Sequence, residues 1–350
     1  MAGGGTGGHV IPALAVAREL KRRGHEPFFV GTERGVEARM VPAAGFELEL
    51  VRIGGLKRVG ALQRLATLGQ LPPSTLRMIR LLRRKRTAAV FSMGGYVAGP
   101  PVMAALLAGT PVIVMEPNAV PGFTNRRIGR FVKRALLSFP ETSRYFPRGR
   151  AELTGLPVRE EFFTLPPKAR ESAFTLLVTG GSQGSRTLNR AARESWPLFR
   201  QSVLKVRFVL QTGQSSFEEL HKEFAAAGLE GEVLPFIDNM PAAFAGADLI
   251  VCRSGAGAVA ELAAAGKPSV LVPFPFAADD HQLHNARAFE RAGAASVVLD
   301  RDWNGAKLFE TVTALAASRG VLDRMGSQAR ELAQPGAARR AAEILEEVSS

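Results

Sequence analysis

The chain has 350 residues, of which 46% are hydrophobic and 22% are charged. This composition excludes a disordered chain, and the length exceeds what one hydrophobic core usually organises, so two domains are expected. The lone Cys252 excludes an intramolecular disulfide and favours a cytosolic protein. No basic segment followed by an apolar core opens the sequence, so no signal peptide is expected.

Charge is distributed unevenly along the chain. The net charge is +13, yet residues 1–150 hold 24 basic and 8 acidic residues, whereas residues 151–350 hold 21 and 24. Between Val51 and Met115 there are ten basic residues and no acidic one. This asymmetry predicts an anionic partner for the N-terminal half: nucleic acid, an acidic membrane surface or an anionic substrate.

In the first half, short apolar segments alternate with helical patterns. A helix is predicted over Pro12–Arg23, ended by Gly24. The uncharged segment Ala88–Met115 is broken by glycines and prolines into a strand, a loop, a short helix and a strand, which argues against a membrane span. The strands predicted here are His25–Gly31, Phe46–Ile53, Ala88–Ser92, Pro111–Met115 and Arg134–Ser138.

The second half repeats this alternation, which predicts an α/β fold with two doubly wound domains. We expect residues 1–157 and 158–335 to form the domains, and 336–350 a helix that packs back on the first. Ligands of such folds bind at the carboxyl ends of the strands, so a cleft between the domains is expected. The strands predicted here are Ala173–Thr179, Lys205–Gln211, Glu232–Pro235, Asp248–Cys252, Ser269–Val272 and Ala295–Leu299.

A glycine-rich motif, GGGTGGH, occupies Gly3–His9 and leads into the first helix. Glycines let the backbone approach a phosphate or sugar, and a helix N-terminus attracts anions. Gly3, Gly5 and Gly8 also satisfy G-x-G-x-x-G, and Glu33 lies near the spacing of a ribose-binding acid. An NAD(P)-dependent oxidoreductase therefore remains an alternative at this point.

Two further glycine-rich turns follow predicted strands. They are MGGYVAGP at Met93–Pro100 and GGSQGS at Gly180–Ser185, the latter opening the second domain as the first motif opens the first. Three such turns over two domains fit a nucleotide-sugar enzyme better than a single dinucleotide site.

Taken in order, the motifs resemble those of the MurG family of muramyl-lipid N-acetylglucosaminyltransferases. The resemblance covers nearly the whole chain and rests on GGTGGH, MGGYVAGP, GGSQGS with Leu188-Asn189, FIDNM (Phe236–Met240), CRSGAGAVAE (Cys252–Glu261) and HQLHNA (His281–Ala286). It implies a GT-B fold and an inverting transfer of N-acetylglucosamine from UDP-N-acetylglucosamine to lipid I, giving lipid II for peptidoglycan synthesis, without a metal or other cofactor.

The resemblance also implies roles for residues. Ser182 would contact the diphosphate, Ile237 the uracil and Glu261 the ribose hydroxyls. Gly5, Gly8, Gly94, Gly95 and Tyr96 would form the acceptor and phosphate loops of the first domain. The remaining donor-binding candidates are Thr6, Gly7, Gly8, Asn118, Arg159, Gly181, Gln183, Gly184, Ser254, His281, Gln282 and Asn285.

The chain departs from the family pattern in three places. Pro117 and Leu156 each replace a polar residue beside Asn118 and Arg159, which are retained. Only Met1-Ala2 precede the first glycine loop, where a buried apolar strand is expected. The sequence therefore predicts that the native chain begins upstream of Met1.

The transfer needs a group that accepts the proton of the attacking hydroxyl. His9 is the candidate base, because imidazole titrates near neutrality, although it could instead only orient its loop. Asp300-Arg301-Asp302 has the D-x-D pattern of metal-dependent transferases, but its position favours a turn or a helix cap. We expect Cys252 to be a core residue and not a nucleophile.

The segment Leu76–Arg86 combines apolar residues with five arginines and a lysine. With lipid I as acceptor, it predicts reversible attachment to an anionic membrane at the cytoplasmic face of the bacterial inner membrane. A core-facing helix with a solvated basic side is the alternative. Nucleic acid is not expected, because the stretch lacks interleaved aromatic residues. The predicted membrane residues are Leu76, Ile79, Leu82, Arg80, Arg83 and Arg84.

Other functions remain open on the motifs alone. A glycolipid synthase that uses diacylglycerol, or a UDP-sugar epimerase, would share the donor motifs. A basic membrane-binding or nucleic-acid-binding module without catalysis would share the charge pattern.

Overall fold

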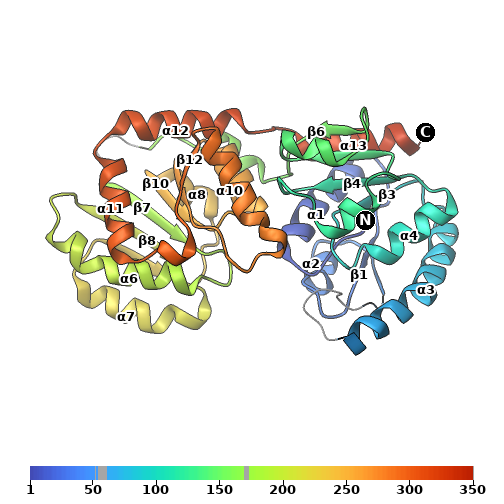
Figure 1. Cartoon of the computed structure of the whole chain (residues 1–350), viewed down its shortest axis with the longest axis horizontal. Helices are drawn as coiled ribbons and strands as arrows, with labels where there is room; N and C mark the ends of the chain where they lie inside the picture. Colours follow the sequence, from blue (N-terminus) through green and yellow to red (C-terminus); the bar gives the residue numbers. More distant parts are fainter. Residues whose placement is uncertain (52, 54–60, 169–172, 350) are drawn as a thin grey trace. The chain divides into compact units, whose positions relative to one another are not determined.

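The computed structural model describes residues 1–51, 53, 61–168 and 173–349, with the backbone alone for 61–68. The chain divides into two compact units, here called the N-terminal and C-terminal units. The N-terminal unit comprises Met1–Val158 and Gln334–Ser350, and the C-terminal unit comprises Arg159–Ala333. Each is an α/β unit in which helices cover a parallel sheet (Figure 1).

The sheet of the N-terminal unit is parallel throughout. Its described strands pair as β1-β2 and as β3-β4-β5-β6. Ala2 joins the two groups, because it makes parallel bridges to both Val30 and Ser92. The strands are β1 (Phe29–Gly31), β2 (Leu48–Leu50), β3 (Val90–Ser92), β4 (Val112–Glu116), β5 (Arg134–Leu137) and β6 (Ala151–Leu153).

Helices surround this sheet, and one of them comes from the far end of the chain. The helix α13 packs on α1, where Arg23 forms a 2.9 Å ion pair with Glu346. Arg340 of α13 also pairs with Glu152 of β6 at 2.6 Å. The helices are α1 (Gly7–Arg22), α2 (Glu37–Ala43), α3 (Ala61–Arg84), α4 (Gly99–Ala108), α5 (Phe123–Ile128), η1 (Pro140–Tyr145) and α13 (Ala337–Ser349).

The first helix begins earlier than predicted. It starts at Gly7, five residues before the expected Pro12, so Gly7 and Gly8 form its first turn. Low helix propensity is tolerated there, because the N–H groups of a first turn need no partner within the helix. The glycine loop proper is therefore shorter than the motif and ends at Thr6.

The C-terminal unit contains a six-stranded parallel sheet in the order β12-β11-β10-β7-β8-β9. The strands are β7 (Phe174–Thr179), β8 (Val206–Gln211), β9 (Gly231–Leu234), β10 (Leu249–Cys252), β11 (Ser269–Leu271) and β12 (Ala295–Val297). The helices are η2 (Glu160–Thr164), α6 (Arg186–Gln201), η3 (Gln214–Ser216), α7 (Phe217–Ala227), α8 (Met240–Gly246), α9 (Ala256–Ala265), η4 (Ala278–Asp280), α10 (His281–Arg291), η5 (Asp300–Asp302), α11 (Gly305–Ala316) and α12 (Arg319–Glu331).

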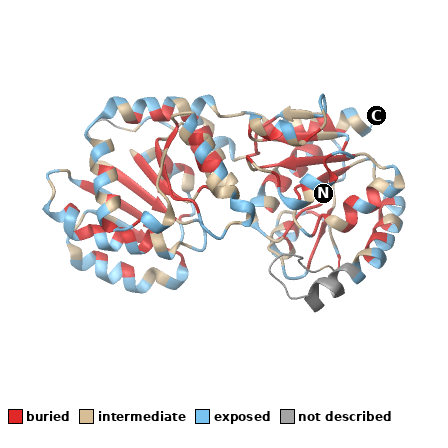
Figure 2. Ribbon diagram, viewed as in Figure 1, coloured by how far each residue is buried: buried red, intermediate tan, exposed pale blue. Residues whose placement is uncertain are grey.

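Each unit has its own buried core, in which the strands lie beneath their helices (Figure 2). In the C-terminal unit, aromatic side chains join α6 to the sheet and to its neighbours. Phe199 of α6 packs edge-on against Phe208 of β8 and Phe309 of α11, at centroid distances of 5.2 and 4.9 Å. Such contacts add to the free energy gained by burying large apolar side chains.

Every predicted strand has a counterpart in the structure, usually shorter by one to four residues. Residue 52, near the end of the predicted strand 46–53, lies outside the described residues. The strand β6 was not predicted, because its three residues, Ala-Glu-Leu, form no apolar run. The uncharged segment Ala88–Met115 is divided into β3, α4 and β4 as predicted. Among the described helices none is both long and apolar enough to cross a membrane.

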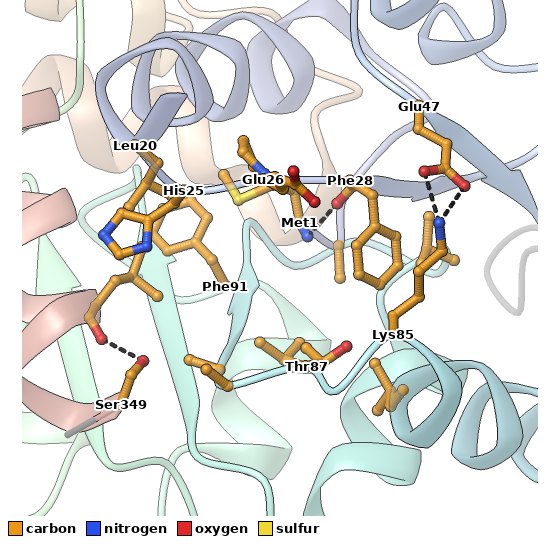
Figure 3. Close-up of a pocket in the computed structure, with 18 of the residues that line it drawn as sticks. Met1, Leu20, His25, Glu26, Phe28, Glu47, Lys85, Thr87, Phe91 and Ser349 are labelled. Carbon is orange, nitrogen blue, oxygen red and sulfur yellow. Dashed lines mark hydrogen bonds and ion pairs between the residues drawn. The ribbon is translucent and has the colours of Figure 1, made fainter. Parts of the chain in front are cut away.

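A cavity of about 570 Å³ lies at the amino ends of β1 and β3, beside Met1 (Figure 3). The Met1 ammonium group donates a 2.7 Å hydrogen bond to the Phe28 carbonyl oxygen, and burial lowers its pKa to about 5. At the rim, Lys85 pairs with Glu47 at 2.6 Å. Because the glycine-rich loops follow the carboxyl ends of the strands, this cavity is separate from them.

The strand order reverses once in each sheet. In the C-terminal unit the reversal lies between β7 and β10, since the chain runs from β7 to β8 and β9 and then returns to β10. In the N-terminal unit it lies between Ala2 and β3. Ligands of doubly wound folds bind at such reversals, beyond the carboxyl ends of the strands.

Candidate functional site

The loop Gly180–Ser185 leaves β7 at the reversal and leads directly into α6. Ser185 caps this helix, because its hydroxyl oxygen accepts a 3.4 Å hydrogen bond from the backbone N–H of Leu188. Ser182 and Gln183 are exposed, and a side chain at Gly181 would meet no atom within 4 Å. The loop thus offers an open backbone and the positive end of a helix to an anion.

The loop after β8, which begins at Thr212, packs against the loop Gly180–Ser185. A Cβ atom at Gly184 would lie 1.8 Å from the Thr212 carbonyl oxygen, so only glycine allows this approach. The buried Asn189 of α6 donates a 2.9 Å hydrogen bond to the same carbonyl oxygen. Both contacts position the loop Gly180–Ser185 over the end of β8.

Gln211, the last residue of β8, connects the predicted diphosphate and uracil positions. Its side-chain amide donates to the Gly181 carbonyl oxygen at 2.7 Å and accepts from the Ile237 backbone N–H at 3.2 Å. Gln211 is not among the residues predicted from the sequence. Its one signal was a polar side chain at the end of an otherwise apolar strand, VRFVLQ.

Arg253 follows β10 across the reversal and contacts the helix cap. Its guanidinium group donates a 2.7 Å hydrogen bond to the Ser185 hydroxyl and forms a 2.5 Å ion pair with Asp300. Thr187 also donates to the Asp300 carboxylate, at 3.3 Å. Asp300–Asp302 form the short 3-10 helix η5, which agrees with the predicted turn, and the Asp300 carboxylate pairs with Arg253. Arg253 lies within the motif CRSGAGAVAE, but no role was predicted for it from the sequence.

Glu261 of α9 is the most perturbed carboxyl of this region. Burial raises its pKa to about 7, and the positive charge of Arg159 lowers it in part. Arg159 itself is exposed and lies over the Phe162 ring, 5.0 Å from its centroid. A carboxyl kept in an unfavourable environment is typical of a functional site.

The predicted sugar-binding residues surround Ser254. The Ser254 hydroxyl donates a 2.8 Å hydrogen bond to the Gln282 carbonyl oxygen, and the buried Asn285 donates to the Ser254 carbonyl oxygen at 3.2 Å. The Gln282 side chain accepts from the Phe274 backbone N–H at 3.0 Å. His281 contacts the Ala278 carbonyl oxygen at 2.6 Å. The four residues therefore form one cluster at the start of α10.

In the N-terminal unit, the loops after Ala2 and β3 meet at the reversal. A Cβ atom at Gly95 would lie 3.4 Å from the His9 ring, and one at Gly5 would lie 3.5 Å from the Tyr96 ring. His9 Nδ1 lies 3.2 Å from the Gly4 carbonyl oxygen. Since a carbonyl oxygen only accepts, Nδ1 carries the proton, and Nε2 is the basic nitrogen of the neutral ring.

Thr6 precedes α1 but does not cap it through its side chain, which makes no capping hydrogen bond. Thr6 and Gly8 are exposed, and Gly7 and Gly94 complete the two loops. The predicted loop residues of this unit are thus brought together by the structure.

Asn118 is held by a buried carboxylate. Glu116, at the end of β4, accepts from the Asn118 backbone and side chain at 3.0 and 3.2 Å, and from the Asn125 side chain at 3.0 Å. Burial raises the Glu116 pKa despite these bonds. Glu116 therefore shapes the loop after β4.

The predicted membrane surface needs a correction. Leu82 is buried at 4% exposure and Ile79 packs against the core, because this side of α3 faces α4 and the sheet. Leu76 is 49% exposed, and Arg80, Arg83 and Arg84 are exposed as predicted. On the neighbouring α4, Met103 and Leu107 are 44% and 67% exposed.

Cys252 is a core residue, as predicted. It is 2% exposed, and burial raises the pKa of its thiol to about 12, which keeps it protonated and unreactive at neutral pH.

The whole chain resembles known proteins. The profile of the glycosyltransferase family 28 N-terminal domain matches residues 1–137, and that of the family's C-terminal domain matches residues 175–345. A UDP-N-acetylglucosamine–N-acetylmuramyl-(pentapeptide) pyrophosphoryl-undecaprenol N-acetylglucosamine transferase of Solibacter usitatus is 66% identical over 349 residues, which cover 100% of this chain and 95% of that protein. The enzyme of the same name from Myxococcus xanthus is 42% identical, over 98% of this chain and 91% of that protein.

Comparison with solved structures supports the same family. The crystal structure of Acinetobacter baumannii MurG matches with a TM-score of 0.83 and 34% identity, over 98% of this chain and 97% of that one. A UDP-GlcNAc 2-epimerase from Neisseria meningitidis shares the fold, with a TM-score of 0.67 at 14% identity over 97% of each chain. The expected fold class, two α/β domains of the GT-B type, is confirmed. With two domain profiles in order and close relatives over its full length, the chain belongs to the MurG family of glycosyltransferase family 28.

Proposed function

We propose that this chain transfers N-acetylglucosamine from UDP-N-acetylglucosamine to lipid I, the undecaprenyl-diphosphate muramyl pentapeptide, giving lipid II for peptidoglycan synthesis. The names of its relatives describe this reaction, and 66% identity over the full chain supports the same reaction for this protein. The NAD(P)-dependent oxidoreductase and the module without catalysis are set aside by the same comparison.

The observation that carries the donor site is the loop Gly180–Ser185 at the sheet reversal. Cleavage of the sugar–phosphate bond leaves negative charge on the UDP diphosphate. Backbone N–H groups at the start of α6 are aimed at such a charge and need no reorganisation during the reaction. Arg253 adds a positive charge next to the Ser185 cap. We assign the diphosphate to Gly181, Ser182, Gln183 and Gly184.

Glu261 supports the nucleoside position. Burying this carboxyl costs free energy, which is why its pKa rises to about 7. A pair of ribose hydroxyls would donate to the carboxylate and offset that cost. Ile237, whose backbone N–H is held by Gln211, would lie at the uracil. His281 and Gln282 would contact the sugar, while Ser254 and Asn285, both 0% exposed, would hold the Gln282 backbone.

The acceptor reaction needs a base in the N-terminal unit. The muramyl 4-hydroxyl attacks the anomeric carbon, the bond from that carbon to the diphosphate oxygen breaks, and the hydroxyl proton leaves. We assign the proton to His9 Nε2, because Nδ1 already donates to the Gly4 carbonyl oxygen. Thr6, Asn118, Tyr96 and Arg159 are assigned to substrate positioning.

Membrane attachment is proposed for the exposed sides of the packed helices α3 and α4, which carry Leu76, Met103 and Leu107. These exposed apolar side chains accompany the arginines at 80, 83 and 84. Each arginine near an anionic leaflet contributes about 1 kcal/mol, and the apolar side chains add to this by burial. We therefore place the protein as a peripheral enzyme at the cytoplasmic face of the inner membrane, where lipid I is embedded.

The experiment that tests this function is UDP release with a lipid I analogue. Release should depend on that acceptor and not on diacylglycerol, which separates this reaction from glycolipid synthesis. Glu261→Ala should mainly raise the KM for UDP-N-acetylglucosamine, whereas His9→Ala should mainly lower kcat. UDP release without any acceptor dependence would contradict the proposal.

A further inference from the structure

Glu37 is a buried acid without a role in the reaction described above. It is the first residue of α2 and its exposure is 0%. A carboxylate is kept in such a place only when hydrogen bonds replace its lost hydration. Its partners therefore indicate what it is for.

Both oxygens of the Glu37 carboxylate are occupied. Oε2 accepts from the Gly5 backbone N–H at 2.7 Å. Oε1 accepts from the Thr32 backbone N–H at 3.0 Å and from the Thr32 hydroxyl at 2.8 Å. Burial alone would raise the Glu37 pKa, but these bonds outweigh it and hold the pKa below its ordinary value. Glu37 is thus an anion that joins the loop after Ala2 to the end of β1.

Glycines from two separate segments make room for this carboxylate. A Cβ atom at Gly4 would lie 2.4 Å from Glu37 Cδ, one at Gly31 would lie 2.5 Å from its Cγ, and one at Gly35 would lie 2.1 Å from its Oε2. Real Cβ atoms do not approach other atoms so closely. These positions therefore require glycine because Glu37 fills the space.

One peptide group connects Glu37 to His9. The Gly5 N–H that Glu37 accepts and the Gly4 carbonyl that contacts His9 Nδ1 belong to the same peptide bond. In a trans peptide these two groups point in opposite directions, so fixing one fixes the other. Gly5 has a φ of +85°, a conformation from which the peptide could rotate at little cost. The carboxylate holds the orientation that His9 needs.

We propose that Glu37 is a positioning residue, which fixes the Gly4–Gly5 peptide so that its carbonyl oxygen keeps the proton of His9 on Nδ1. Glu37 does not touch the reacting atoms and acts through His9. The effect on the reaction rests on the proposed role of His9 as base, whereas the effect on the tautomer does not.

The test is Glu37→Gln in the full chain. Glutamine keeps one oxygen for Thr32 but turns an amide N–H₂ toward the Gly5 N–H, which removes only the bond to the loop. Glu19→Gln is the matched control, since Glu19 is a second buried carboxylate of this unit and pairs with Arg23. Thr32→Val is a further control, because it leaves the bond from Gly5 in place.

The measurement is the ¹⁵N NMR spectrum of the histidine rings. The chain has five histidines, and the signals missing from the spectrum of His9→Ala identify those of His9. We expect His9 to carry its proton on Nδ1 in the wild type and both controls, and on a mixture of Nδ1 and Nε2 in Glu37→Gln. For transfer to a lipid I analogue, kcat should fall by about 10²-fold, as misplaced catalytic groups do. The KM for UDP-N-acetylglucosamine should change less than about twofold, because the donor residues lie in the other unit.

An unchanged His9 tautomer in Glu37→Gln would overturn the proposal. Where His9→Ala lowers kcat, a loss of kcat in Glu37→Gln no larger than that in Glu19→Gln would overturn it as well. If His9→Ala keeps its kcat, the base assignment fails, and the spectrum still decides the role of Glu37. If Glu37→Gln does not fold, Glu37→Asp replaces it. The shorter side chain retains the charge but withdraws from Gly5, so the same tautomer change is expected.

Discussion

The side-chain amide of Gln211 donates a 2.7 Å hydrogen bond to the Gly181 carbonyl oxygen and is 1% exposed. Its other end accepts from the Ile237 backbone N–H. One side chain thus sets the spacing between the loop assigned to the diphosphate and the residue assigned to the uracil.

Replacing Gln211 by leucine should raise the KM for UDP-N-acetylglucosamine about tenfold. The change leaves the buried Ile237 N–H without its partner, which costs about 1–3 kcal/mol, and removes one of the two hydrogen bonds of the exposed Gly181 carbonyl oxygen, so that the two segments can move apart. The measurement is donor-dependent UDP release at saturating acceptor. Gln201→Leu, at the exposed far end of α6, should leave the KM unchanged. Equal KM values for both variants would contradict the role of Gln211.

Glu261→Gln should be more stable than the wild type at high pH and bind the donor less tightly. The folded-state pKa of about 7 lies above the ordinary 4.5, so between these values the folded chain retains a proton that the unfolded chain has lost. The carboxyl therefore costs no stability below pH 4.5, and its full cost is reached above pH 7.

Thermal melts across this pH range test the prediction. The melting temperature of Glu261→Gln should exceed that of the wild type at pH 8, by about 2–4 °C for each kcal/mol that the buried carboxylate costs, and the difference should vanish near pH 4.5. Glu310→Gln, on the exposed side of α11, is the control and should show no such pH dependence. A wild type more stable than the variant at pH 8 would show that the Glu261 carboxylate is compensated within the protein.

A chelator should not change the rate of transfer. The first carboxylate of the D-x-D pattern is already engaged by Arg253 and Thr187, so it does not present its oxygens to a divalent cation. We expect the same kcat with and without EDTA, measured as UDP release. Asp300→Asn should lower kcat in both conditions alike, because Arg253 loses the carboxylate that holds it beside the Ser185 cap. A rate that falls with EDTA and recovers with Mg²⁺ would contradict this prediction.

Leu107→Glu should weaken binding to vesicles rich in phosphatidylglycerol by about tenfold. The side chain is 67% exposed, and its transfer from water to the lipid interface is lost with the substitution. Val203→Glu, at a 97% exposed position of the C-terminal unit, is the matched control. Cosedimentation at several salt concentrations gives both affinities. If the two variants bind alike, α4 is not part of the membrane surface.

Much of the fold was predictable because its signals are local. Buried parallel strands such as Val112–Glu116 are continuous apolar runs, and the glycine turns that follow them mark the carboxyl edge of the sheet. The start of α1 was not predictable from local signals. Gly7 and Gly8 have the composition of a loop, and they become helical through their position before a strong helix.

The candidate site was predictable only in part. Motif residues such as Ser182 and Glu261 could be assigned by resemblance, yet the residues that hold them could not. Gln211 and Glu37 act on backbone groups 30 and 32 residues away, and no spacing rule connects such positions. Leu82 and Leu107 show the same limit, because the periodicity of α3 could not reveal that α4 covers one of its sides.

The return of α13 to the N-terminal unit has a consequence for how the protein forms during synthesis. Residues 334–349 leave the ribosome after the whole of the C-terminal unit, yet Arg340 pairs with Glu152 of β6 and Glu346 pairs with Arg23, directly after α1. The N-terminal unit is therefore translated first, but its fold is completed only after the C-terminal unit has been synthesised. Until then the side of α1 that α13 covers stays uncovered, which makes the nascent N-terminal unit a natural client for chaperones.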